Sequence, residues 1–145
     1  MSTPDYKYGT GLGNVGSYQV SGKPFITSSV VPQSGAQPTF HKLRFPSVTK
    51  EIKIYNNGAT SQNVRVAFSS NGLNNTVKNY FIIQPVADGG KAETFDVKAT
   101  ELYLMCDIAQ TPLVSVYASL TGIDVDRVDN ISPSGSNWSG SLGIG

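Results

Sequence analysis

The fold is decided by the stretch from Thr49 to Gly72, which reads TKEIKIY, NNG, ATSQ and then NVRVAFSSNG. In its first half, Ile52 and Ile54 alternate with charged or aromatic residues, and in its second half Val64, Val66 and Phe68 repeat the pattern with Arg65 on the opposite side. A period of two is typical of a strand with one buried face and one wet face, because successive side chains leave the backbone on opposite sides. The stretch therefore predicts two strands, and the short link predicts that they are antiparallel neighbours.

Similar short apolar segments recur along the chain between turn residues such as Asp88-Gly89-Gly90. Strands are expected over residues 25–31, 39–45, 49–55, 64–68, 80–84, 93–97, 102–106 and 114–121. No segment repeats its apolar residues with the 3.6-residue period of a helix. The pattern predicts an all-β protein with a single antiparallel β-sandwich of about eight strands, spanning residues 23–123. Jelly-roll and immunoglobulin-like connections both fit.

Two segments rich in glycine and serine flank this core, at residues 1–22 and 124–145. We expect both to be extended arms, since their glycine content suits neither a helix nor an ordinary strand. Aromatic side chains outside a core often anchor interfaces, because they bury a large area with few rotors. The expected partner-binding residues are Tyr6, Tyr8, Leu12, Tyr18, Trp138 and Ile144. The alternative is that the aromatic residues among them pack back onto their own sandwich.

The composition narrows the choice of function. The length of 145 residues suits one domain, and the net charge of +1 gives no general attraction to nucleic acid or anionic membranes. No apolar run approaches the roughly 20 residues of a membrane helix, and the first residues lack the apolar region of a signal peptide. We therefore expect a protein made in a cytoplasm, with no nucleic-acid and no membrane partner. The single cysteine, Cys106, rules out an intrachain disulfide.

The motifs that could indicate catalysis or ligand binding are better explained as structural features. Residues 11–16 match G-x-G-x-x-G, but neither the strand before nor the helix after that a dinucleotide site needs is predicted. The sole histidine, His41, lies in a predicted strand without a nucleophile-elbow sequence, and Cys106 occupies an apolar position. The acidic residues 124–130 lack the glycine and closing glutamate of a calcium loop. We expect no cofactor, no metal and no enzymatic activity.

Five basic residues could gather on one face of a sheet, namely Lys42, Arg44, Lys50, Lys53 and Arg65. Glu51 would reduce the positive charge of such a patch, and Tyr55 alone offers a ring on which a nucleobase could stack. Nucleic-acid binding usually combines several aromatic residues with a clear positive charge. This arrangement therefore gives little support for a nucleic-acid site.

Several stretches resemble structural proteins of aquatic viruses, including tailed phages. They are GNVGSYQVSG at 13–22, VAFSSNG at 66–72, ELYL at 101–104, ASLTGI at 118–123 and NWSGS at 137–141. The resemblance covers most of the chain and implies a β-sandwich on a capsid or tail. It supplies no catalytic residues.

These observations favour a non-enzymatic component of a virion. The expected role is a capsid decoration or cement protein, which joins neighbouring capsid subunits through its sandwich and its arms and forms a homo-oligomer. The alternatives are a tail or head-fibre component, or a carbohydrate-binding module that takes a glycan through exposed aromatic residues.

Overall fold

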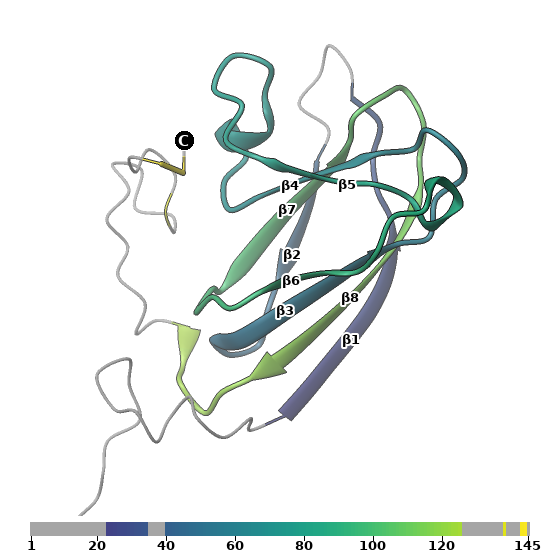
Figure 1. The fold of residues 1–145 in the computed structure, drawn as a ribbon. Coiled ribbons are helices and arrows are strands. Elements are labelled where there is room, and N and C mark those ends of the chain that lie inside the picture. The colour runs from purple at the N-terminus through teal and green to yellow at the C-terminus, as the bar shows by residue number, and fades with distance from the viewer. Residues whose placement is uncertain (1–22, 35–39, 126–137, 139–142, 145) are drawn as a thin grey trace, which may run out of the picture.

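The computed structural model describes residues 23–34, 40–125, 138 and 143–144. They form two four-stranded antiparallel sheets packed face to face (Figure 1). In the first sheet the order is β1 (Lys23–Val30), β8 (Leu113–Leu120), β3 (Thr49–Asn56) and β6 (Glu93–Phe95). In the second it is β2 (His41–Arg44), β7 (Glu101–Cys106), β4 (Val64–Ala67) and β5 (Phe81–Ile83). Two short 3-10 turns, η1 (Asn71–Leu73) and η2 (Val86–Asp88), lie in the loops. The predicted all-β sandwich is confirmed.

The pairing of the strands identifies the topology. The first strand pairs with the last, β2 with β7, β3 with β6, and β4 with β5, all antiparallel. This nesting is that of one long hairpin rolled into two sheets, which is a jelly roll. An immunoglobulin-like sandwich would place its first two strands side by side in one sheet, whereas β1 and β2 lie in different sheets. The jelly-roll alternative is therefore the one observed.

The core lies between the two sheets, where the alternating apolar residues meet. Ile52, Ile54 and Val64 are completely buried, as their period of two predicted. One side of the sandwich is closed by Phe25 and Phe45, whose rings meet edge to face at 5.7 Å. The remaining buried members of this cluster are Val31, Leu43, Val66, Ile83, Ala99, Leu102, Leu104, Val114, Val116, Ala118 and Leu120.

The expectation that β3 and β4 are neighbours is wrong. Strand β3 pairs with β8 and β6, and β4 pairs with β7 and β5, so the two face each other across the core. The link crosses from one sheet to the other, and the side chain of Asn56 holds it there by donating to the carbonyl oxygens of Gln62 (2.8 Å) and Ile83 (2.9 Å). Asn56 is therefore buried, and so is Gly72 at the far end of the stretch.

The outer face of β4 is also covered, contrary to the expectation of a wet face. Only 6% of Arg65 and 2% of Ala67 are exposed. The loop that carries η1 folds over this face and buries Leu73 in a second apolar cluster with Tyr103 and Met105. A period of two shows that a strand has two different faces, but it carries no information about a loop that later covers the polar one.

The basic residues do not form one patch. Lys42 and Arg44 lie on β2 in the second sheet, and Lys53 lies on β3 in the first. Cys106 is a buried residue of β7, as predicted. Within the described part of the chain, no helix has the length and apolar character needed to cross a membrane.

Candidate functional site

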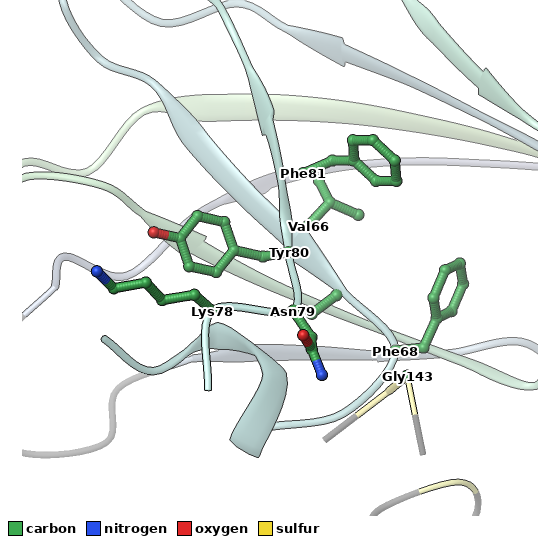
Figure 2. Close-up of a pocket in the computed structure, with 8 residues that line it drawn as sticks. Val66, Phe68, Lys78, Asn79, Tyr80, Phe81 and Gly143 are labelled. Carbon is green, nitrogen blue, oxygen red and sulfur yellow. The ribbon is translucent and has the colours of Figure 1, made fainter. Parts of the chain in front are cut away.

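A pocket opens where β4 and β5 separate. Their ladder ends at the pair Val66–Phe81, and beyond it the two chains diverge around a hollow of about 320 Å³. Figure 2 shows residues from both sides of this gap, with Gly143 from the C-terminal segment beside Phe68. The lining is mainly apolar and aromatic: Val66, Ala67, Phe68, Lys78, Asn79, Tyr80, Phe81 and Gly143.

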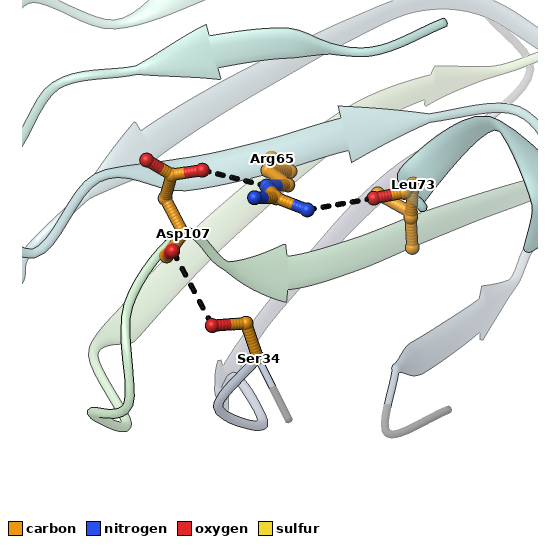
Figure 3. Close-up of polar contacts among 4 residues, drawn as sticks. All are labelled: Ser34, Arg65, Leu73 and Asp107. Carbon is orange, nitrogen blue, oxygen red and sulfur yellow. Dashed lines mark hydrogen bonds and ion pairs between the residues drawn. The ribbon is translucent and has the colours of Figure 1, made fainter. Parts of the chain in front are cut away.

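One wall of the pocket is supported by a buried arginine. The guanidinium of Arg65 lies 4.7 Å from the ring centre of Tyr80, within the range of a cation–π contact. Its Nε donates to Oδ1 of Asp107 at 2.6 Å, and its Nη1 donates to the carbonyl oxygen of Leu73 at 2.9 Å (Figure 3). Arg65 therefore connects the ends of two strands, the covering loop and the pocket wall.

The opposite wall belongs to a row of aromatic rings at one side of the sandwich. Phe81 of β5 meets Phe95 of β6 at 5.7 Å, and Phe95 meets Phe68 edge to face at 6.4 Å. The row continues from Phe68 to Trp138 at 5.9 Å. Each such pair contributes about 1 kcal/mol beyond its buried area. Phe81 is nonetheless 66% exposed, so the row ends in a large ring open to solvent.

Of the predicted partner-binding residues, Trp138 and Ile144 are described. Trp138 is half-buried against Phe68 and also packs on the buried pair Val48 and Ile123. The carbonyl oxygen of Ile144 accepts a hydrogen bond from the hydroxyl of Ser69 at 3.1 Å. Both thus contact their own sandwich beside the pocket.

The other four predicted residues, Tyr6, Tyr8, Leu12 and Tyr18, lie outside the described residues. Their assignment as contacts stays a prediction.

Gly72 leaves the space in which the C-terminal segment lies. A Cβ at this position would stand 2.7 Å from the carbonyl oxygen of Ile144 and 3.0 Å from that of Asn79. We expect Gly72→Ala to release residues 143–144 at a cost of about 1–2 kcal/mol in unfolding free energy, because a crowded site gives way at its least anchored side. Backbone {¹H}–¹⁵N NOE values of Gly143 and Ile144 measure the release.

The control is Gly89→Ala, which strains a left-handed position at φ 82° but meets no atom within 4 Å. If both substitutions leave the NOE values of the tail unchanged, the carbonyl of Ile144 is not held at Gly72.

Polar groups at the rim add directional contacts to this apolar hollow. Lys78 and Asn79 lie on the chain segment that leads into β5, directly before Tyr80 (Figure 2). Lys78 has φ 56°, a left-handed conformation that is uncommon for a residue with a side chain and costs of order 1 kcal/mol. A cation and an amide beside aromatic walls suit an apolar side chain with a polar end, or the face of a sugar ring.

Outside the pocket, a cluster of titratable side chains on β2 and β7 makes structural contacts. Glu101 receives the hydroxyl of Tyr103 at 2.6 Å and lies 3.4 Å from the ammonium of Lys42. Burial, and then the bond to Glu101, raise the pKa of Tyr103 well above its usual range, so this phenol stays protonated. Nε2 of His41 is buried without a hydrogen-bond partner in the described chain. Among the same residues, no three metal-ligating side chains cluster.

The pocket was not predicted from the sequence. Tyr80 and Phe81 were assigned to a strand, and no expectation placed them at a site. A usable signal was present in the two adjacent aromatic residues that follow the mainly polar stretch from Asn74 to Asn79. Adjacent strand residues point to opposite faces, so both rings cannot enter one core. Neither the protein-family models nor the curated proteins compared with this chain give a match.

Proposed function

We propose that this chain is a non-enzymatic structural protein of a virion, and that it acts as a capsid decoration or cement protein. The observation that carries the proposal is the presence of exposed apolar side chains at two opposite sides of one sandwich. At the β1 side, Ile26 is 72% exposed and Val30 is 60% exposed. At the β5 side, Phe81 is 66% exposed beside the pocket. A protein that joins two neighbours needs two such contact surfaces.

The separation of these surfaces follows from the topology. Contacts between Phe25 and Phe45 place β1 over the end of β2, and contacts between Phe81 and Phe95 place β5 under β6. The strand orders then put β1 and β5 at opposite edges of the sandwich (Figure 1). Large exposed apolar side chains that gather at an edge are typical of protein–protein contacts.

The fold is compatible with this role but does not identify it. Jelly rolls occur in viral capsid proteins, and also in lectin domains and cupins. Function depends on the site rather than the fold. The aromatic pocket supports a binding role, because a hollow of about 320 Å³ can accept a side chain or a single ring from a partner. The arms at residues 1–22 and 124–145 would add tethered contacts, which raise affinity through effective concentration.

The first test is the composition of purified particles. In purified intact virions of the virus that encodes it, quantitative mass spectrometry should find this chain at a fixed ratio to the major capsid protein. Its absence from intact particles would overturn the proposal.

Phe81→Ser tests the contact surface at the pocket. We expect the variant to bind stripped particles about tenfold or more weakly, because a largely exposed ring that inserts into a partner contributes at least 1.4 kcal/mol. The matched control is Ile108→Ser, an exposed apolar residue outside the pocket. Equal occupancy of particles by both variants and the wild type would contradict a role for the pocket.

A glycan-binding module is the second candidate, favoured by an open hollow whose lining includes the amide of Asn79 and the ring of Tyr80. A sugar can stack on such rings in the isolated protein, without a capsid present. A glycan array with the isolated protein separates the two functions: a signal that Phe81→Ser removes supports this candidate, and a blank array rejects it for the sugars displayed.

A further inference from the structure

The four edges of the sandwich differ in how they are protected against other chains. A free edge exposes unpaired backbone groups, and proteins usually blunt it with short strands, charges, proline or bulges. Strands β5 and β6 are edges of three residues each. Strand β2 has four residues, and two of them are Lys42 and Arg44. Strand β1 has eight residues, only Lys23 at its first position is charged, and its register with β8 is uninterrupted.

The backbone of β1 presents a specific set of donors and acceptors at this edge. The N–H of Val31 donates to the carbonyl oxygen of Pro112 at 2.9 Å, in the same register as the β1–β8 ladder. Hydrogen bonding alternates along an antiparallel strand, so the odd-numbered residues bond to β8. The N–H and C=O groups of Ile26, Ser28 and Val30 therefore face outward. Pro24, which lacks a donor, occupies the one remaining outward position of the strand.

The same alternation explains why β2 is protected. The N–H of Phe45 donates to Thr100, so the odd-numbered residues of β2 bond to β7. The residues whose backbone groups face outward are then Lys42 and Arg44, and the side chain of Arg44 is 73% exposed. Comparable positions on β1 carry isoleucine, serine and valine. Among the strands that the structure describes, the contrast marks β1 as the edge that is open to strand addition.

We propose that the edge of β1 binds the β1 strand of a second copy of this chain, antiparallel, with a twofold axis at Ser28. In this register Ile26 lies opposite Val30 of the other copy, and Ser28 lies opposite its counterpart. All outward N–H and C=O groups of Ile26, Ser28 and Val30 are then paired across the axis. The two four-stranded sheets become one continuous sheet.

The occupant follows from the self-complementarity of the strand. Directly opposite residues must share a face, so only registers that pair even with even positions are allowed. Among these, the register centred on Ser28 matches the two most exposed apolar residues of the strand with each other, Ile26 at 72% and Val30 at 60%. It also places the two Lys23 side chains about ten residues apart, roughly 34 Å, so that they do not repel.

The residues of β8 that pair with β1 extend the contact on the outer face. Ile26 lies beside Tyr117, and Val30 lies beside Leu113, which is 44% exposed. Two isologous patches of this kind would meet along the axis, because a twofold interface uses the same surface on both copies. The dimer does not rest on the virion role, and it leaves the pocket at β5 free on each copy.

The first measurement is the oligomeric state of the full chain by analytical ultracentrifugation over a range of concentrations. We expect a dimer in reversible equilibrium, and Ile26→Lys should raise its dissociation constant by about 100-fold, since each dimer loses two buried isoleucine side chains. Val77→Lys is the matched control, because it adds the same charge at an exposed apolar residue in a loop away from β1. A chain that stays monomeric at all concentrations overturns the proposal, as does a dimer that Ile26→Lys leaves intact.

Amide exchange and cross-linking test the register. On dimerisation, exchange should slow at Ile26, Ser28 and Val30, while the amides of Phe25, Thr27 and Ser29 are slow in both states because they bond to β8. Ser28→Cys should cross-link to itself with a short thiol reagent, and Lys23→Cys should not. Slow exchange at Ile26, Ser28 and Val30 in the monomer would mean that another segment of the same chain covers the edge, and would refute the dimer.

Discussion

Asp107→Ala is expected to lower the free energy of unfolding by about 3 kcal/mol and the melting temperature by about 8 °C. The substitution leaves the guanidinium of Arg65 without its partner in a place where only 8% of that side chain is exposed. The loss should fall at the low end of the range for broken buried pairs, because Asp107 is 31% exposed and partly screened by water. Chemical denaturation followed by circular dichroism measures it.

Two further variants separate the buried charge from general damage. Asp124→Ala removes an exposed aspartate and should stay within about 0.5 kcal/mol of the wild type. The double variant Arg65→Met with Asp107→Ala should be more stable than Asp107→Ala alone, because no charge is then buried unpaired. If Asp107→Ala and Asp124→Ala cost the same, the ion pair does not hold the covering loop and the pocket wall.

Asn56→Ala is expected to destabilise the fold by about 3 kcal/mol. The side chain of Asn56 is 1% exposed and makes three hydrogen bonds: it donates to Gln62 and Ile83 and accepts from the N–H of Gly58 at 2.8 Å. Alanine leaves these backbone groups without their partner, and each buried group so deprived costs about 1 kcal/mol or more. Thermal and urea unfolding give the value.

The neighbouring asparagine is the control for this prediction. Asn57 is exposed and donates to the hydroxyl of Ser115 at 2.8 Å in contact with solvent. Asn57→Ala should therefore change stability by no more than about 0.5 kcal/mol, since water replaces the lost partner. Similar losses for both variants would mean that the crossover between the sheets does not depend on Asn56.

The strands were predictable from the sequence, whereas their partners were not. The alternation of Ile52 with Ile54 predicted a half-buried strand correctly, because burial of one face is a local property of the chain. The neighbours of that strand are β8 and β6, which lie far away along the sequence. A period of two tells which face is buried but not which strand lies alongside, and the closeness of Val64 in sequence misled the prediction of a hairpin.

The candidate pocket depends on contacts that the sequence does not display. Arg65 had the pattern of a surface residue until a loop covered it, and its ion pair with Asp107 joins positions 42 residues apart. The sequence predicted that aromatic residues of the tails make contacts with partners. Of these residues, Trp138 is described, and it lies at the end of the aromatic row. Tyr80 and Phe81 both line the hollow because the β4–β5 ladder ends at Phe81, and strand ends are set by tertiary packing.

The nested pairing of the strands also sets the order in which the sheet can be completed. Lys23 pairs with Leu120, so β1 has no partner until almost the whole core has left the ribosome. At about 5–20 residues per second, the 96 residues between Lys23 and Leu120 take roughly 5–20 s to synthesise. Throughout that time the edge of β1 that will pair with β8 lacks this partner. Loop closure over such a distance is also slow, so we expect folding in the range of milliseconds to seconds even after release.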